Sequence, residues 1–177
     1  MPPTITTERL RLRPFTEGDL EAAYMVLEGH PDVWRFDPGF QRTREQRDEI
    51  ILKYARQNED DGCGTLAITN PQTSDLLGYV GLQLYVLPRE PLATPEVELY
   101  YKLGRDAWGQ GYAYEACRAL ARFAFDNMRL TQLVTITDKR NTGSIRLLER
   151  LGMRVEPAPP SWPGMMMGTL ANDRTPA

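Results

Sequence analysis

The amino-acid sequence predicts a mixed fold of the α/β or α+β class, with about seven strands and about four helices. Two stretches, residues 9–15 and 95–103, alternate apolar and polar side chains with the period of two that is typical of a strand. A third stretch, which begins near Tyr112, has the period of a helix and is polar along only one narrow stripe, so we expect it to be buried against a sheet. No internal repeat or Gly/Ser linker divides the 177 residues, and we expect a single domain over residues 1–177.

The N-terminal half is expected to hold a strand, two helices and a hairpin. Pro14 ends the first strand, and Thr16 is a good N-cap for the helix that follows. The expected elements are a strand at residues 9–15, helices from Thr16 to about Gly29 and from Thr43 to about Asn58, and hairpin strands at residues 65–69 and 77–87.

The C-terminal half is expected to alternate strands and helices. Gly104 ends the strand at residues 95–103, and Gly152 is a natural stop for the last helix. The expected elements are the strand at residues 95–103, a long helix from about Tyr112, a strand at residues 132–137, a short helix at residues 141–151, and strands that begin at residues 153–155 and 165–170.

The composition is that of an ordinary globular protein, with 41% hydrophobic and 25% charged residues and a formal net charge of −3. A single histidine, His30, rules out a metal site built from several histidines, and we expect no metal. Cys63 and Cys117 lack the spacing of a metal or redox motif. The sequence has neither an apolar run long enough to span a membrane nor a signal-peptide pattern, so we expect a cytoplasmic protein with no membrane partner.

The charge is distributed unevenly along the chain. Residues 101–154 contain ten basic and five acidic residues, although the whole chain is net acidic. A positive region in an acidic protein favours a compact polyanionic ligand over a long nucleic-acid track, and we expect no nucleic-acid partner. Exposed charges on helix surfaces are the alternative explanation.

The strongest chemical signal is the turn Gly109-Gln110-Gly111, which lies between a strand and the long helix. The free backbone amides at the start of a helix, together with the positive end of the helix dipole, form a site for an anion. Glycines at this point have no side chain, so a phosphate can approach the backbone closely. The P-loop of nucleoside triphosphatases is excluded, because Gly111 is not followed by Lys and Ser or Thr. A dinucleotide site is a poor second, because Tyr114 stands where its third glycine is needed, although Asp138 resembles its ribose-binding acid.

Four stretches together carry a resemblance to a known family. They are residues 7–14 (TERLRLRP), 77–81 (LGYVG), 108–116 (WGQGYAYEA) and 141–152 (NTGSIRLLERLG). They resemble the GNAT superfamily of N-acetyltransferases, and most nearly its ribosomal-protein N-terminal acetyltransferase, or Rim-type, branch. The resemblance extends from about Thr7 to Val155.

The resemblance implies a mostly antiparallel central sheet, splayed between its fourth and fifth strands, with acetyl-CoA as the acyl donor. The pantetheine arm would lie in the gap, the pyrophosphate would bind the amides of the glycine turn, and Arg146 or Arg140 would reach the 3′-phosphate. Trp108 departs from the Gln or Arg that the general family pattern has at the start of the turn. The coenzyme-binding residues so implied are Tyr101, Leu103, Trp108, Gly109, Gln110, Gly111, Tyr112, Ala113, Tyr114, Asn141 and Arg146.

Acyl transfer from a thioester to an amine needs a base for the amine and a proton donor for the thiolate. In the branch resembled, a carboxylate often acts as base through water, which indicates Glu98; a solvated strand carboxylate is the alternative. Many members place a tyrosine acid where this chain has Leu148, so Ser144 is the candidate acid. Water is the other possible proton source. Tyr100, Tyr101 and Tyr114 are further candidate donors.

The acceptor groove implied by the family would be lined by Trp34, Arg35, Phe36, Phe40 and Tyr85, although aromatic side chains are more often core residues. The acidic remainder of the protein favours a cationic acceptor such as a peptide N-terminus or a small amine. The sequence thus predicts an acyl-CoA-dependent N-acyltransferase that is a monomer or homodimer. A catalytically silent acyl-CoA-binding or sensing module is the rival hypothesis, because the tyrosine acid is missing.

Overall fold

The computed structural model describes residues 3–37, 39–60, 64–87 and 94–172, and it is built around one eight-stranded sheet. The strands are β1 (Ile5–Thr6), β2 (Arg11–Pro14), β3 (Thr65–Thr69), β4 (Leu76–Leu87), β5 (Thr94–Leu103), β6 (Gln132–Asp138), β7 (Arg154–Pro157) and β8 (Met165–Ala171). Their order across the sheet is β1-β2-β3-β4-β5-β6-β8-β7. All neighbours are antiparallel except β5 and β6, which are parallel.

Four α-helices and three short 3₁₀ helices connect the strands. They are η1 (Glu17–Asp19), α1 (Leu20–Glu28), η2 (Pro31–Trp34), α2 (Arg44–Asp60), η3 (Arg105–Ala107), α3 (Tyr112–Asp126) and α4 (Thr142–Arg150). None of the described helices is both long enough and apolar enough to cross a membrane.

The predicted fold class is confirmed, and the differences lie at the N-terminal end. The sheet gains an eighth strand, because Ile5 and Thr6 pair with the strand that follows them. The first predicted strand, residues 9–15, is shortened at its start, because the amide of Arg9 donates to the Glu115 carboxylate instead of to a neighbouring strand. The first helix begins with the 3₁₀ turn η1, where the Asp19 carboxylate accepts from the amide of Thr16 at 2.8 Å.

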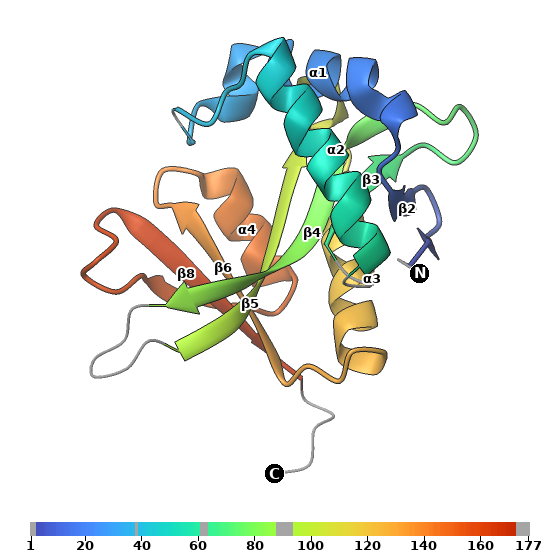
Figure 1. The fold of residues 1–177 in the computed structure, drawn as a ribbon. Coiled ribbons are helices and arrows are strands. Elements are labelled where there is room, and N and C mark those ends of the chain that lie inside the picture. The colour runs from blue at the N-terminus through green and yellow to red at the C-terminus, as the bar shows by residue number, and fades with distance from the viewer. Residues whose placement is uncertain (1–2, 38, 61–63, 88–93, 173–177) are drawn as a thin grey trace.

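Different helices cover the two faces of the sheet, and α1 and α2 lie together on one of them (Figure 1). Neighbouring residues of β4 show the alternation. Tyr79 packs with Leu27 of α1 and Ile51 of α2, whereas Val80 packs on the other face with Leu120 of α3. The predicted burial of α3 is confirmed, since only its narrow polar stripe faces solvent.

The central strand β5 is covered on both faces. Leu99 and Leu103 pack toward α3, as the alternating pattern predicts. Glu96 and Glu98 point to the opposite face and are only 7% and 9% exposed, so the polar face of this strand is buried rather than solvated. A buried carboxylate needs hydrogen-bond partners or a functional reason for its position.

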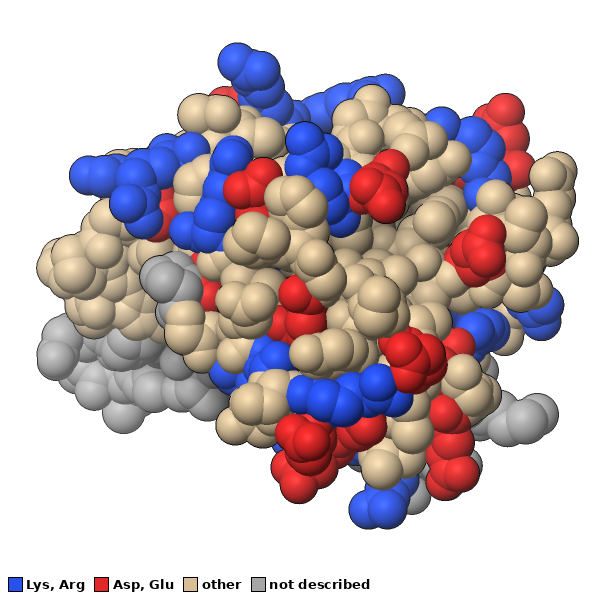
Figure 2. Space-filling model, turned by 90° about the horizontal axis from the view of Figure 1, so that it is seen from above, with Lys and Arg blue, Asp and Glu red and all other residues tan. Residues whose placement is uncertain are grey.

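Charged residues are unevenly spread over the end of the molecule that carries α1 and α2. Seen from above, Lys and Arg side chains gather along the upper edge of the view, and Asp and Glu side chains are more frequent toward the lower edge (Figure 2). The net charge of −3 therefore does not describe how charge is distributed over this face.

One buried ion pair joins the end of α1 to α2. Glu28 and Arg47 have side chains that are each 2% exposed. Arg47 Nε donates to Glu28 Oε1 at 2.8 Å, and Arg47 Nη2 contacts the same oxygen. The other carboxylate oxygen accepts from the amide of Arg42 at 3.0 Å. The guanidinium also lies over the Trp34 ring, 5.2 Å from its centroid, so the pair fixes the loop between the two helices.

We expect Arg47→Met to lower the free energy of unfolding by about 3 kcal/mol, because it leaves the Glu28 carboxylate buried without its partner charge. Urea unfolding followed by circular dichroism measures the change. Arg56→Met, at an exposed position of the same helix, is the control and should change stability by less than about 0.5 kcal/mol. Equal effects of the two substitutions would show that the buried pair does not hold the helices together.

Candidate active site

A turn with two glycines leads from β5 into α3. Gly109 and Gly111 have φ of 74° and 80°, a left-handed conformation that glycine adopts without a Cβ clash. Gly111 is the N-cap of α3, and its carbonyl accepts from the Glu115 amide at 3.1 Å. The amides before Glu115 therefore open at the positive end of the helix dipole, where they fit a phosphate group. A Cβ added to Gly109 would meet no atom within 4 Å, so the space above the turn is open.

The side chains of the turn shape it and leave its amides to a ligand. The Trp108 indole N–H donates to the carbonyl of Leu103 at 2.9 Å. The Gln110 side-chain amide donates to the carbonyl of Asp106, also at 2.9 Å. Trp108, which departs from the general pattern of the family resembled, thus ties the turn to the end of β5.

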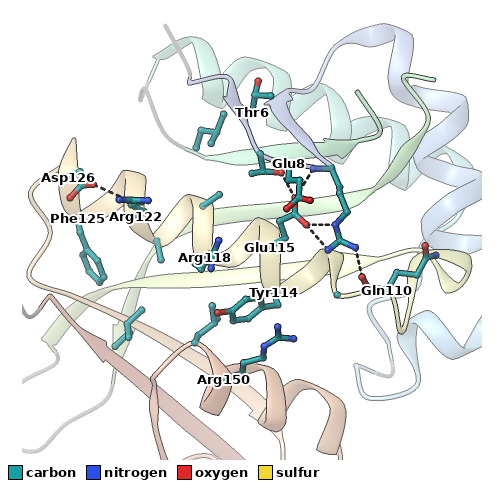
Figure 3. Close-up of a pocket in the computed structure, with 18 of the residues that line it drawn as sticks. Thr6, Glu8, Gln110, Tyr114, Glu115, Arg118, Arg122, Phe125, Asp126 and Arg150 are labelled. Carbon is teal, nitrogen blue, oxygen red and sulfur yellow. Dashed lines mark hydrogen bonds and ion pairs between the residues drawn. The ribbon is translucent and has the colours of Figure 1, made fainter. Parts of the chain in front are cut away.

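An N-terminal latch, formed by Thr7, Arg9, Gln110 and Glu115, holds the turn against the start of the chain (Figure 3). Glu115 Oε1 accepts from Thr7 Oγ1 at 2.6 Å and from the Arg9 amide at 2.9 Å. Glu115 Oε2 accepts from Arg9 Nε at 2.8 Å, and Arg9 Nη1 donates to the Gln110 carbonyl at 2.9 Å. Burial disfavours ionisation, but the hydrogen bonds from Thr7 and Arg9 outweigh it and lower the pKa of Glu115.

The latch was not predicted from the sequence. Arg9 was expected in a strand and Glu115 in the polar stripe of a helix, and the two residues are 106 positions apart. No local pattern reports so distant a contact. The position of Glu115 in the first turn of α3, beside the glycine turn, was the only available signal.

The two central strands separate next to this turn. Glu98↔Val134 is the only register pair that joins β5 to β6, although β5 continues to Leu103 and β6 to Asp138. On its other side β6 pairs with β8 from Gln132 to Asp138. The C-terminal half of β5, which holds Tyr101 and Leu103, therefore borders a gap, as a sheet splayed between these strands requires.

Glu98 lies at the point where the strands separate. Gln83 of β4 donates through Nε2 to Glu98 Oε2 at 2.6 Å, and the backbone of Ile136 in β6 also hydrogen-bonds to the carboxylate. Burial raises the pKa of Glu98, and these two hydrogen bonds oppose the shift without cancelling it. A carboxyl group with a raised pKa at the end of a strand gap is suited to accept a proton.

Ser144 and Tyr101 meet on the other side of the gap. Tyr101 Oη donates to Ser144 Oγ at 3.3 Å, and Ser144 is 9% exposed in the first turn of α4. Burial, with a smaller contribution from Cys117, raises the pKa of Tyr101 to about 12, so its hydroxyl stays protonated. Because Ser144 Oγ accepts from Tyr101, the serine's own proton is free to be donated to another group. Leu148 is buried in the core and offers no proton.

The residues at and near the start of α4 that are predicted to bind the coenzyme have different surroundings. Asn141 is the N-cap of α4, and its Oδ1 accepts from the Ser144 amide at 3.1 Å. Arg140 forms an ion pair with Asp138 at 2.6 Å, and this contact lowers the pKa of Asp138 to about 2. Arg146 is exposed on α4. Of the two arginines, Arg146 has the more available charge.

A groove of about 670 Å³ lies beside α2, and residues from both faces of β4 line it: Gln83 is on the face where Glu98 is buried, and Leu82 and Leu84 are on the face toward α3. Described residues that line it include Trp34, Phe40, Tyr54, Tyr79, Gln83 and Tyr100. The ring centroid of Tyr79 lies 6.1 Å from that of Tyr54 and 6.1 Å from that of Tyr100. Tyr100 Oη and Thr65 Oγ1 are joined by a hydrogen bond of 2.5 Å. The groove adjoins the gap through Gln83, which lines it and binds Glu98.

Of the predicted acceptor residues, Trp34 and Phe40 line this groove, whereas Arg35 and Phe36 do not. Trp34 lines the groove, but it is 6% exposed and its indole N–H donates to the Leu27 carbonyl at 2.6 Å, which is the role of a core residue. Phe36 is not among the lining residues. The Arg35 guanidinium lies over its ring, 4.5 Å from the ring centroid. The side chain of Tyr85 lies outside the described part of the structure.

Titratable residues elsewhere do not suggest a metal centre. Within the described ranges, no group of three or more His, Cys, Asp or Glu side chains is placed to hold a metal ion. His30 instead uses Nδ1 to accept from the Asp32 amide, as the N-cap of η2.

Comparisons with known proteins agree with this geometry. The family model described as the acetyltransferase (GNAT) domain matches residues 9–154. The chain is 28% identical to the N-acetyltransferase p20 of Bacillus licheniformis over 157 residues, which cover 86% of this chain and 83% of that protein. The crystal structure of an acetyltransferase from Agrobacterium tumefaciens strain C58 superposes on this chain with a TM-score of 0.79 and 28% sequence identity. The match covers 97% of this chain and 96% of that chain.

A Rim-type structure is also similar. RimL, a ribosomal L7/L12 alpha-N-protein acetyltransferase in complex with coenzyme A, has a TM-score of 0.76 at 16% identity, over 98% of this chain and all of its own. That likeness is one of fold. Because the family model spans well over half of the sequence and the strand gap and glycine turn lie within it, the chain belongs to the GNAT family of acetyltransferases and is an N-acetyltransferase of this type.

Proposed function

We propose that this protein transfers an acetyl group from acetyl-CoA to a primary amine, by direct attack of the amine in a ternary complex. The observation that carries the proposal is the separation of β5 from β6 after Glu98↔Val134, directly beside the glycine turn at the start of α3. One cleft thus offers an anion site and a strand edge. Membership in the GNAT family supports acetyl-CoA as the donor.

The chain's own residues fit the coenzyme along this cleft. The amides of residues 109–114 bind the pyrophosphate, and the open space above Gly109 admits its oxygens. The backbone of Tyr101 and Leu103 pairs with the pantetheine arm as a strand would. Asn141 retains its Nδ2 hydrogens for the arm, since only Oδ1 serves as the helix cap. Arg146 binds the 3′-phosphate.

Bound acetyl-CoA supplies a thioester carbonyl as the acetyl donor. Glu98 removes a proton from the incoming amine, directly or through one water, and its raised pKa suits this exchange near neutral pH. Ser144 gives its proton to the departing thiolate, while Tyr101 holds the serine oxygen in place. The base and the acid lie on opposite faces of β5, so the amine enters from the groove beside α2 and the thiol leaves on the side of α4.

The rival function is a silent acyl-CoA-binding or sensing module, and Leu148 at the position of the family's tyrosine favours it. Acetyl-CoA incubated with a panel of primary amines separates the two, with free thiol as the readout. Thiol release that depends on the amine supports transfer. Tight acetyl-CoA binding by calorimetry without thiol release from any amine would favour the silent module.

The proposal extends to the organisation of the protein. We propose that residues 1–177 act as one domain in the cytoplasm, as a monomer or homodimer with no nucleic-acid or membrane partner. The single sheet that runs from Ile5 to Ala171 supports one domain. The acceptor could be a peptide N-terminus or a small-molecule amine.

We expect Gly111→Asp to weaken acetyl-CoA binding at least about tenfold, because it adds a negative charge to the turn that binds the pyrophosphate, although the new Cβ would lie 3.5 Å from Arg9 Nη2. Isothermal titration calorimetry measures the dissociation constant. Gly111→Asn is the matched control, since asparagine tolerates a positive φ about as well as aspartate but carries no charge. If both variants bind acetyl-CoA equally well, the pyrophosphate does not lie on this turn.

We expect Glu115→Gln to raise the KM for acetyl-CoA about fivefold with little change in kcat, because the N-terminal latch then no longer holds Arg9 against the turn. Steady-state kinetics at saturating amine provide the measurement. Glu149→Gln, at an exposed position on α4, should leave both constants unchanged. A selective fall in kcat would show that the latch does not act through the coenzyme.

We expect Glu98→Gln to lower kcat about 100-fold at pH 7, with a deficit that shrinks as the pH rises and the amine loses its proton unaided. In the native enzyme the rate should fall as the pH drops through the raised pKa of Glu98, because the protonated carboxyl cannot act as base. The variant should lack this limb. Glu96→Gln, two residues away on the same buried face, is the control and should keep the native pH dependence. Identical pH–rate profiles for the native enzyme and Glu98→Gln would show that Glu98 is not the base.

A further inference from the structure

The groove beside α2 gathers the exposed apolar side chains of the protein. Four large hydrophobic residues are exposed in the described part of the chain, and three of them, Phe40, Leu84 and Met128, line this groove. Leu84 is 74% exposed and Phe40 59%. Exposed apolar residues that collect at one concave site mark a binding surface, whereas scattered ones do not.

The charged residues that line the same groove are basic. Its described lining contains Arg42, Arg47 and Lys53, and no Asp or Glu. The charge of Arg47 is balanced by Glu28 inside the protein. Lys53 is exposed and forms no ion pair or hydrogen bond with any described residue, so its charge is available to a ligand. Two acidic side chains nearby are already engaged, because Glu98 accepts from Gln83 and Asp37 pairs with Lys102. Glu49, one turn before Lys53 on α2, is not among the described lining residues.

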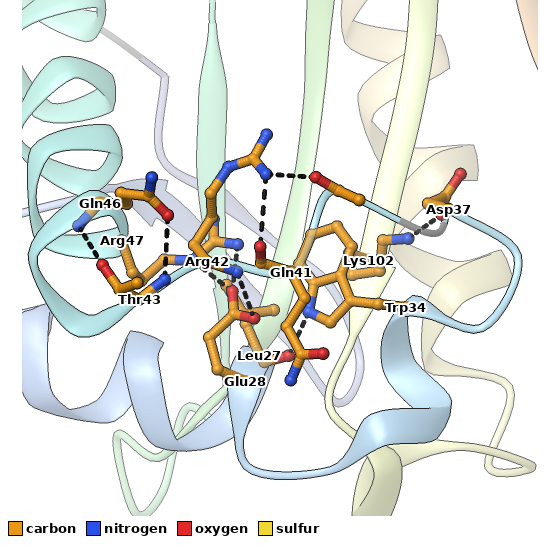
Figure 4. A network of polar contacts seen from close by, with 11 residues as sticks. Leu27, Glu28, Trp34, Asp37, Gln41, Arg42, Thr43, Gln46, Arg47 and Lys102 are labelled. Carbon is orange, nitrogen blue, oxygen red and sulfur yellow. Dashed lines mark hydrogen bonds and ion pairs between the residues drawn. The ribbon is translucent and has the colours of Figure 1, made fainter.

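Arg42, which lines the groove, is tied to the loop before α2 by hydrogen bonds (Figure 4). Its Nη1 donates to the carbonyls of Gly39 at 2.7 Å and Gln41 at 3.4 Å, and its guanidinium lies 5.4 Å from the centroid of the Phe40 ring. Nε and Nη2 take no part in these bonds and keep their hydrogens. A guanidinium fixed in this way, with donors left over, suits a carboxylate or phosphate oxygen.

The groove therefore brings together two kinds of polar group. Gln83 lines it and binds Glu98, the proposed base, where the reacting nitrogen must be. Arg42 and Lys53 add positive charge to the same lining, which also holds the rings of Phe40 and Tyr54. A volume of about 670 Å³ is in the range of small-molecule sites.

We propose that the acceptor is a small molecule whose primary amine is joined, through an apolar or aromatic body, to a carboxylate or phosphate that binds Arg42 and Lys53. The inference rests on the proposed acetyl transfer and specifies its substrate class. It reverses the expectation of a cationic acceptor, which came from the acidic composition of the whole chain. The charges that line the groove, and not the net charge, decide which amine approaches Glu98.

Matched acceptors that differ only in the remote group test the inference. 4-(Aminomethyl)benzoate carries its amine and its anion at opposite ends of an aromatic ring, and 4-(aminomethyl)benzamide has the same shape without the charge. 4-(Aminomethyl)phenyl phosphate is the phosphate arm and shows which anion is preferred. We expect kcat/KM to be at least about tenfold higher for the benzoate or the phosphate than for the benzamide. Raising the salt concentration should reduce this preference.

Variants locate the preference in the groove. Lys53→Gln and Arg42→Gln should each raise the KM for the anionic acceptor several-fold while leaving kcat and the KM for acetyl-CoA unchanged. Lys53→Glu should favour the dication 4-(aminomethyl)benzylamine over the benzoate. Arg56→Gln removes the same charge one turn further along α2, outside the groove lining, and should change nothing.

The outcomes separate this inference from the proposed function. Equal kcat/KM for the benzoate, the phosphate and the benzamide overturns the inference and leaves acetyl transfer standing. A preference for anions that survives in Lys53→Gln and Arg42→Gln also overturns it. Bound acetyl-CoA with no acetylation of any amine overturns both.

Discussion

The site depends on the interruption of pairing between β5 and β6. Two parallel strands that paired to their ends would satisfy each other's backbone groups and leave no edge for a ligand. Here they meet at Glu98↔Val134 and then diverge, and β6 is held on its other side by β8 over its full length. The sheet stays intact because the two halves pair normally on either side. The backbone edge left open by the gap is the one that we propose the coenzyme arm pairs with.

Strand geometry then distributes the chemistry. Glu98 and Tyr101 are an odd number of residues apart in β5, so their side chains point to opposite faces of the sheet. Glu98 shares its face with the aromatic groove beside α2, and Tyr101 reaches Ser144 at the start of α4. Both are buried, which raises the pKa of each, but with different consequences. The pKa of the Glu98 carboxyl moves toward neutral pH, which suits the proposed base, whereas the Tyr101 hydroxyl stays protonated and donates to Ser144.

The sequence predicted those features that depend on neighbouring residues. Alternation identified β5, the polar stripe identified the buried face of α3, and the glycines at 109 and 111 marked the turn, where the structure places both at positive φ. Contacts between distant residues were beyond such patterns. Neither the hydrogen bond from Gln83 to Glu98 nor the contact of Arg9 with Glu115 has a local signal, and the burial of Trp34 depends on an arginine in the next helix. The polarity of the groove was likewise hidden, because net charge averages over all surfaces.

The N-terminal latch has a thermodynamic consequence for the whole molecule. Arg9 bonds at once to the Gln110 carbonyl and to the first turn of α3, so order in the turn and order in residues 7–9 are linked. Linkage is reciprocal: a ligand that is bound more tightly by the ordered turn must also lower the population in which residues 7–9 are detached from it. Hydrogen exchange at the amide of Arg9 would thus report whether a ligand occupies the glycine turn, more than a hundred positions further along the polypeptide. A fusion partner attached near residues 7–9 could in the same way change the affinity of the turn for its ligand.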